Sequence, residues 1–422
     1  MSRQPGALRS VVPTRRLTRP AAFWSVAVLL VLMLAASGVP SPLYRVYAEE
    51  FGFGPGVLTT IFAIYAFALL GSLLVVGGLS DHVGRRPVIA SGLALEAVAM
   101  ALFWAADGVG WLLVARVVQG LATGVLTSAL GAWLLDLQRR DKPLGPFINS
   151  AAPGIGLSVG AFGAGLLVQL VPSPTDWVFG VLTVVFVLAA PGVLLLLPET
   201  SPRVPGARSS LRPRVEVARP QRPAFLLALP VVVAAWALGG LYASLGPSLV
   251  ADVFGVDNHI AGGLLILALN GTGVFGSLAV RTVAPQKALV GGALTFVVGV
   301  VGTVTAVLTG SLVLLFVAAV VTGFAFGAAF FGAIAMVTDG VAPGHRAGLL
   351  AAVFVVGYLA FSLPAIAAGL AVPAIGLARA TEIYGGVVIV LALVAVASVT
   401  LQARRSRRSA AAPAADSEPI AA

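Results

Sequence analysis

Two ionisable residues, Glu96 and Arg116, lie within long stretches of apolar sequence. A charged side chain in such a place is costly, and it usually faces a partner or an aqueous cavity. Glu96 could carry a proton or pair with Arg116. The alternatives are a purely structural ion pair, or an Arg116 side chain that reaches the outer interface. Both residues are therefore candidates for coupling an ion to transport.

Other reactive chemistry has little support in the sequence. The absence of cysteine excludes disulfides and thiolate metal sites. The three histidines (His82, His259 and His345) do not cluster with other metal ligands. A phosphate-binding loop requires Gly-Lys followed by Ser or Thr, whereas Lys142 and Lys287 precede Pro and Ala. We expect no metal, no cofactor, no ATP hydrolysis and no enzymatic activity.

The elements that must position Glu96 and Arg116 are membrane helices. Apolar residues make up 59% of the 422-residue chain and charged residues 10%, whereas soluble chains contain about 25% charged residues. A bilayer requires roughly 20 apolar residues per helix. The sequence predicts an all-α integral membrane protein of two six-helix bundles, with Pro40 and Pro42 bending or ending the first helix. The predicted spans are 22–43, 56–79, 87–106, 111–137, 145–171, 177–197, 224–250, 260–283, 288–308, 311–338, 346–372 and 381–402.

The basic residues predict the orientation of these spans. If both termini are cytoplasmic, nearly all of the 26 lysines and arginines fall on the cytoplasmic side. Only Arg45 and Arg379 fall on the other side, and Arg116 lies within a span. This asymmetry follows the positive-inside rule. The net charge of +10 therefore reflects topology rather than nucleic-acid binding, and we expect a multi-pass protein of the cell membrane.

The chain divides into two halves of six predicted spans. We expect a cytoplasmic N-terminal tail (1–21), a first bundle (22–197), a cytoplasmic linker (198–223), a second bundle (224–402) and a disordered cytoplasmic tail (403–422). Gly120 and Asp136 recur as Gly323 and Asp339 at the same separation. Such a repeat is typical of transporters whose halves are related by an axis along the membrane normal.

The loop between predicted spans two and three carries the most specific motif. Residues 77–87 read Gly-Gly-Leu-Ser-Asp-His-Val-Gly-Arg-Arg-Pro, which resembles the signature G-x-L-a-D-r-x-G-R-[KR] of the major facilitator superfamily. The resemblance implies that Asp81 pairs with Arg85 and contacts the start of span eleven, near residues 344–348. Together these contacts would latch an outward-open state. The implied gating residues are Gly77, Asp81, Gly84, Arg85, Arg86 and Asp136.

Two further motifs resemble the same superfamily. Arg116-Val-Val-Gln-Gly120 is similar to its R-x-x-q-G motif, and Gly120 and Gly124 form a small-residue face for helix packing. Residues 156–165 lie where its drug–proton antiporters carry G-x-x-x-G-P-x-x-G-G. Here Ala161 replaces the proline, which weakens that assignment. Gly156 and Gly160 are equally well interpreted as helix-packing positions.

The substrate is the least specified part of the prediction. In this fold the cavity would be lined mainly by aromatic and apolar side chains, and a polar ligand would lack partners once desolvated. We therefore expect a monomeric, proton-coupled exporter of small hydrophobic or amphipathic compounds. The alternatives are an importer or facilitator of an anionic metabolite that uses Arg116, or a sensor or assembly partner that has lost transport. The candidate substrate and coupling residues are Glu96, Arg116, Gln119, Asn149, Trp236, Tyr242, Asn270 and Tyr358.

Overall fold

A computed structural model describes residues 16–141 and 143–411, and all regular secondary structure in these residues is helical. Twelve of the described helical segments are long and apolar enough to cross a membrane, which confirms the predicted fold class. The first half contains α1 (Arg19–Gly38), α2 (Pro40–Phe51), α3 (Pro55–Val76), α4 (Leu79–Val83), α5 (Arg85–Trp104), α6 (Val109–Leu137), α7 (Gly145–Leu170) and α8 (Pro174–Leu196). The linker contains α9 (Ala207–Ser210) and a short 3-10 turn (Arg219–Gln221). The second half contains α10 (Arg222–Ser248), a π-helical turn (Leu249–Val253), α11 (His259–Ala279), α12 (Pro285–Thr309), α13 (Leu312–Thr338), α14 (Pro343–Ile375) and α15 (Leu377–Ala411).

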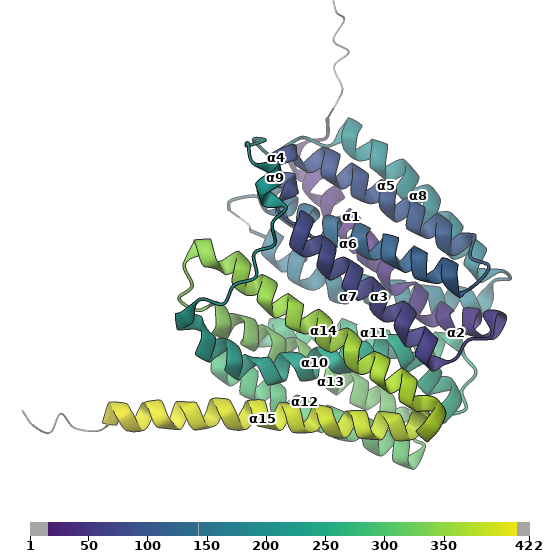
Figure 1. Cartoon of the computed structure of the whole chain (residues 1–422), viewed down its shortest axis with the longest axis vertical. Helices are drawn as coiled ribbons and strands as arrows, with labels where there is room; N and C mark the ends of the chain where they lie inside the picture. The colour runs from purple at the N-terminus through teal and green to yellow at the C-terminus, as the bar shows by residue number, and fades with distance from the viewer. Residues whose placement is uncertain (1–15, 142, 412–422) are drawn as a thin grey trace, which may run out of the picture.

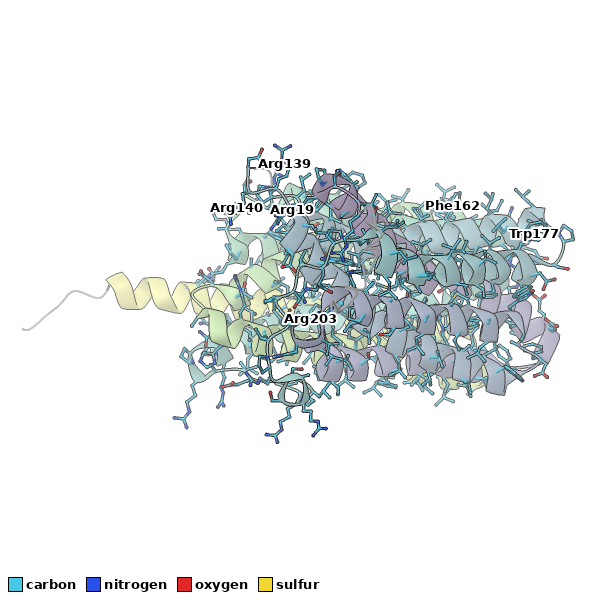
Figure 2. All side chains as sticks on the ribbon, turned by 90° about the horizontal axis from the view of Figure 1, so that it is seen from above. Arg19, Arg139, Arg140, Phe162, Trp177 and Arg203 are labelled. Atoms are coloured by element: carbon cyan, nitrogen blue, oxygen red, sulfur yellow. The ribbon has the colours of Figure 1, made fainter. Side chains whose placement is uncertain are left out.

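The helices form two groups that lie side by side, α1–α8 above α10–α15 in Figure 1. Arg19, Arg139, Arg140 and Arg203 lie at one end of the bundle, and Trp177 lies at the other (Figure 2). We call these the basic end and the opposite end. Lys142, which was predicted on the basic side, lies outside the described residues.

The first span differs from its predicted limits of 22–43. The helix bends at Val39 but continues as α2 to Phe51, so one apolar segment runs from Arg19 to Phe51. Pro40 occupies the first turn of α2. Proline is tolerated there because the N–H that it lacks would have no partner within the helix. The prolines therefore bend the span without ending it.

The two ends of the chain also differ from the predicted boundaries. Helix α1 begins at Arg19, within the predicted tail 1–21, and α15 continues to Ala411, beyond the predicted limit of 402. The expectation of disorder from 403 onward is therefore wrong for 403–411. A run of Ala and Arg supports this extension because both residues have high helix propensity. Residues 1–15 and 412–422 lie outside the described part.

Glycine lets the helices of the first half approach closely. A Cβ atom at Gly124 of α6 would lie 2.6 Å from the carbonyl oxygen of Leu69 in α3. A Cβ atom at Gly156 of α7 would lie 2.8 Å from the carbonyl oxygen of Val31 in α1. Gly120 and Gly160 make equivalent contacts with α3 and α1. These are backbone-to-backbone contacts of the kind that small residues permit between membrane helices.

The two halves contact each other closely toward the opposite end. A Cβ atom at Gly263 of α11 would lie 2.6 Å from the carbonyl oxygen of Ala161 in α7. A Cβ atom at Gly369 of α14 would lie 2.7 Å from the carbonyl oxygen of Pro55 in α3. An ion pair joins Arg45 of α2 to Asp257, with Nη2 2.9 Å from Oδ1. Helices of the two halves therefore pack backbone to backbone in this region.

The linker passes between the halves at the basic end, where it contacts both (Figure 1). The ring Nδ1 of His82 in α4 donates to the carbonyl oxygen of Val204, at 3.0 Å. On the other side, the backbone N–H of Glu216 donates to the carbonyl oxygen of Gly348 in α14, at 3.2 Å. The linker therefore contacts the 77–87 loop and the first turns of α14 at once.

Candidate functional site

The motif at residues 77–87 folds into a compact charged cluster at the basic end. Arg85 is 7% exposed. Its Nε lies 3.0 Å from Oδ2 of Asp136, at the end of α6. Its Nη1 lies 2.5 Å from Oδ1 of Asp81 and 2.6 Å from Oγ of Ser80. Gly84 adopts a φ of 115°, which an L side chain rarely adopts. The turn at Gly84 aligns Arg85 with both carboxylates.

Glu199 organises this cluster, although it was not among the predicted site residues. Its Oε1 accepts hydrogen bonds from the backbone N–H of Arg85 at 2.9 Å and of Thr200 and Ser201 at 3.1 Å. Its Oε2 accepts one from the N–H of Arg86 at 3.1 Å. A carboxylate at a helix N-terminus satisfies free N–H groups and complements the helix dipole. Glu199 therefore fixes the end of α8 to the start of α5.

The predicted contact between Asp81 and the start of α14 is not made in this conformation. Among the described residues, the carboxylate of Asp81 pairs with Arg85, and its backbone carbonyl accepts from Oγ of Ser201 at 2.8 Å. Gly348 instead packs against the linker at Glu216. The reason is geometric: the linker occupies the space beside the first turns of α14.

A second cluster lies deep within the first half, around Arg116. Arg116 is fully buried, and its guanidinium donates to the hydroxyl of Tyr44 and, at 2.6 Å, to Oε1 of Gln119. The guanidinium carbon also lies 4.9 Å from the ring centroid of Tyr65 and 5.7 Å from that of Phe103. Aromatic faces attract a cation that has lost its water. The arginine is therefore enclosed by the helices of one bundle.

Gln119 links Arg116 to Glu96. Its Nε2 donates to Oε1 of Glu96 at 3.4 Å and to the carbonyl oxygen of Ala36 at 3.0 Å. Glu96 is also fully buried, and its Oε2 has no hydrogen-bond partner among the described residues. Nη2 of Arg116 likewise lacks a partner there. The two ionisable residues form a relay through an amide and make no direct ion pair.

The remaining candidate residues do not form one continuous cavity wall. Tyr242 turns into the second half, where its hydroxyl lies 2.7 Å from Oγ1 of Thr303. Nδ2 of Asn149 donates to the carbonyl oxygen of Gly131, and Nδ2 of Asn270 to that of Ile266, each at 3.1 Å. Trp236 and Tyr358 pack together, with ring centroids 4.9 Å apart. Of the predicted residues, the structure brings together Glu96, Arg116 and Gln119 in one place and Trp236 and Tyr358 in another.

The sequence matches a family model over most of its length and resembles known transporters over shorter stretches. A model described as the Major Facilitator Superfamily matches residues 26–363. An MFS-type transporter, paaT, of Penicillium rubens is 28% identical over 155 residues, which is 36% of this chain and 28% of the relative. The class C tetracycline resistance protein of Escherichia coli is 34% identical over 125 residues, which is 29% of this chain and 30% of the relative. The chain therefore matches less than a third of the length of either curated relative.

Two solved structures resemble the whole chain. A bacterial homolog of the human lysosomal transporter Spinster, in an inward-facing and occupied conformation, has a TM-score of 0.72 and 17% identity, covering 92% of this chain and 97% of the homolog. The human organic anion transporter MFSD10 has a TM-score of 0.63 and 18% identity, covering 90% of this chain and all of that one. At such identities the likeness shows a shared fold.

Proposed function

Because the chain belongs to the major facilitator superfamily and is a membrane transporter rather than an enzyme, we propose that it exports small hydrophobic or amphipathic compounds in exchange for protons. In this proposal one polypeptide works as a monomer by alternating access. The basic end faces the cytoplasm, as the positive-inside rule requires. Both termini then lie in the cytoplasm, and the opposite end faces outward.

The observation that carries the proposal is the buried relay of Glu96, Gln119 and Arg116. Glu96 is fully buried with one carboxylate oxygen unpartnered. An ionised carboxylate in such a place is costly unless a partner satisfies it. A proton on Oε2 would remove the cost of burying the charge. A small movement of Gln119 would change that cost, because Gln119 donates to the other carboxylate oxygen. The relay therefore suits a group that binds a proton in one state and releases it in the other.

The alternative, import of an anionic metabolite by Arg116, has less support. An anion-binding arginine must offer donors to the substrate. Arg116 is fully buried among three aromatic rings and already donates to Tyr44 and Gln119. Nη2 of Arg116 is unpartnered among the described residues and is the one guanidinium nitrogen that could donate to an anion. Substrate access to it would require the first bundle to open.

Alternating access requires contacts that exist in only one state. In the structure the halves pack closely toward the opposite end, where Arg45 pairs with Asp257 at 2.9 Å. At the basic end the linker, and not a direct contact between Asp81 and α14, spans the two halves. We propose that this arrangement is the state open to the cytoplasm. Opening to the outside would then break the Arg45–Asp257 pair and bring Asp81 to α14.

The experiment is a retention assay with Glu96→Gln, which keeps the hydrogen-bonding shape of the side chain and removes its charge. Cells that express the natural chain should retain less of a lipophilic dye, and a protonophore should abolish the difference. Glu96→Gln should remove the dependence on the pH gradient. Glu50→Gln is the matched control because Glu50 is exposed. Unchanged pH dependence in Glu96→Gln would rule out the proton-carrier role.

A further inference from the structure

Tyr65 of α3 lies between the buried relay and the second half. The guanidinium carbon of Arg116 lies 4.9 Å from the centroid of its ring, and the ring itself is buried. Tyr65 also belongs to a small apolar cluster of α3, against which Tyr358 and Phe361 of α14 pack. A cation is attracted to the face of an aromatic ring. Tyr65 therefore joins the relay to the place where α3 meets α14.

A second ring beside Arg116, that of Phe103, has a different surrounding. Its centroid lies 5.7 Å from the guanidinium carbon of Arg116. Behind it the ring stacks on Phe179 of α8, with centroids 4.9 Å apart, so both of these neighbours belong to the first half. Tyr65 and Phe103 therefore contribute similarly to the surroundings of Arg116 and differ in what each contacts on its other side.

The contact between α3 and α14 continues from Tyr65 toward the opposite end. The ring centroid of Phe62, three residues before Tyr65, lies 5.0 Å from that of Phe361. Three residues earlier again, Thr59 is fully buried, and a Cβ atom at Gly369 would meet its hydroxyl. Residues three apart share one face of a helix. A displacement of Tyr65 would therefore act on the whole line of contact between the halves.

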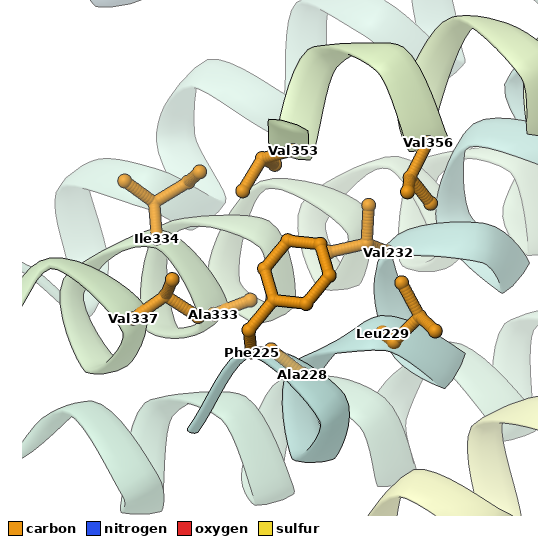
Figure 3. A pocket seen from close by; sticks show the side chains of 9 residues that line it. All are labelled: Phe225, Ala228, Leu229, Val232, Ala333, Ile334, Val337, Val353 and Val356. Carbon is orange, nitrogen blue, oxygen red and sulfur yellow. The ribbon is translucent and has the colours of Figure 1, made fainter. Parts of the chain in front are cut away.

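Behind Tyr358 the second half is packed closely enough to move as one body. The ring centroid of Trp236 in α10 lies 4.9 Å from that of Tyr358. One turn before Trp236, hydrocarbon side chains of α10, α13 and α14 surround a cavity of about 10 Å³ (Figure 3), about the space that one water needs. They are Phe225, Ala228, Leu229, Val232, Ala333, Ile334, Val337, Val353 and Val356. Such close packing transmits a displacement rather than absorbing it.

These contacts give Tyr65 a role in the proposed transport cycle. We propose that Tyr65 is the positioning residue that couples the charge on Glu96 to the contact between α3 and α14. An ionised Glu96 attracts the guanidinium of Arg116, whose Nη2 has no partner in the described part of the chain, away from the Tyr65 ring. The ring then loses its cation, and α3 separates more readily from α14. This inference rests on the proposed proton-carrier role of Glu96 and adds the residue that transmits it.

Few titratable groups surround Glu96. Arg116 of α6 and Tyr65 of α3 face it. Helix α8 also packs against α5, but its one acid, Asp176, lies in its first turn and accepts from Nε1 of Trp104 at 2.9 Å, at the opposite end. Helix α4 contacts α5 at the basic end. Ionisation of Glu96 therefore acts first on Arg116.

The test measures how the charge on Glu96 changes the separation of α3 and α14. A maleimide reacts with Thr59→Cys in the purified full-length protein, whose natural chain contains no cysteine. The rate is divided at each pH by the rate in Glu96→Gln, which stands for the protonated form, so that ionisation of the thiol cancels. This ratio should rise about fivefold or more between about pH 6 and about pH 9, the scale of coupling between two sites.

The variants separate transmission from simple packing, and each is measured with and without Glu96→Gln. Tyr65→Leu should make the ratio independent of pH, because the ring that joins the two sides is lost. Tyr65→Phe should preserve the rise, because it keeps the ring. Phe103→Leu is the matched control: it also removes a ring from Arg116, and the rise should survive.

Three results would overturn the inference. They are a rise that persists in Tyr65→Leu, a rise that Phe103→Leu also abolishes, and a ratio that stays constant or falls with pH when Tyr65 is unchanged. Where Tyr65→Leu does not fold, Tyr358→Leu decides, because it removes the ring on the other side of the contact and leaves the first half intact. It should abolish the rise, and a rise that persists would overturn the inference in the same way.

Transmission and export give separable outcomes. A rise that depends on Tyr65 in a chain that does not lower the cellular content of the dye would overturn export and leave this inference standing. Export whose pH dependence requires Glu96, together with a rise that survives Tyr65→Leu, would overturn this inference alone.

Discussion

The tight contact between α7 and α11 predicts that one methyl group at Gly263 will force the halves apart at the opposite end. A Cβ at Gly263 would lie 2.6 Å from the carbonyl oxygen of Ala161 and 3.0 Å from Cα of Phe162. Both are backbone atoms, which cannot rotate away. Overpacking of this kind costs about 1–3 kcal/mol. The cost falls only on the state in which the helices touch.

The ratio of outward-open to inward-open molecules in Gly263→Ala should therefore rise by about 5- to 150-fold. Gly163→Ala is the matched control, because Gly163 also lies in α7 and a Cβ there would meet nothing within 4 Å. Both substitutions gain about 1 kcal/mol of helix propensity, and that gain is the same in the two states. The difference between the variants isolates the contact.

The assay is the reaction of a maleimide with Thr59→Cys in the purified protein. Thr59 is fully buried beside Gly369, at the other close contact between the halves. The natural chain contains no cysteine, so this thiol is the sole target. Labelling should accelerate with Gly263→Ala and not with Gly163→Ala. Equal rates in the two variants would refute the view that α7 and α11 separate during transport.

Three further predictions concern the charged clusters. Glu199→Gln should lower the free energy of unfolding by about 1–3 kcal/mol, because four backbone N–H groups lose a charged acceptor. Thermal unfolding should show no such change for Glu216→Gln in the linker, and equal melting of the two variants would contradict the argument. Arg45→Gln should speed Thr59→Cys labelling by at most about fivefold, since exposed pairs contribute about 0.2–1 kcal/mol; a larger or salt-insensitive effect would count against it. Arg116→Lys should lower the free energy of unfolding by about 1–3 kcal/mol in the same thermal assay, because a lysine cannot reproduce the planar fork of donors. A variant as stable as the natural chain would show that the fork of donors does not stabilise the first half.

Features that depend on local sequence could be predicted. Hydrophobic length alone locates the twelve membrane helices, because a bilayer imposes that length on every span. Asp81 and Arg85 are four residues apart, so the intervening turn brings them together whatever the rest of the fold does. The end of the first span was harder to predict, because Pro40 is compatible both with stopping a helix and with starting the next.

Features that depend on helix rotation or long-range packing could not be predicted. Tyr242 was expected beside the substrate, but its hydroxyl turns toward Thr303 inside the second half. The sequence places Glu96 and Arg116 in neighbouring helices, but only the rotation of α6 puts Gln119 between them. Glu199 accepts a hydrogen bond from Arg85 across 114 residues of sequence. The sequence shows only that Glu199 is an acid directly after span six, which does not indicate its partner.

The unequal distribution of intramembrane charge has an evolutionary consequence. Glu96 and Arg116 are buried within the first half, whereas no Asp, Glu, Lys, Arg or His of the second half is among the buried residues that the structure describes. Under the proposed function, the group that couples transport to the proton gradient resides on one copy of the repeat. Substitutions inside the second copy can then change its packing, and any contact it makes with substrate, without disturbing that group.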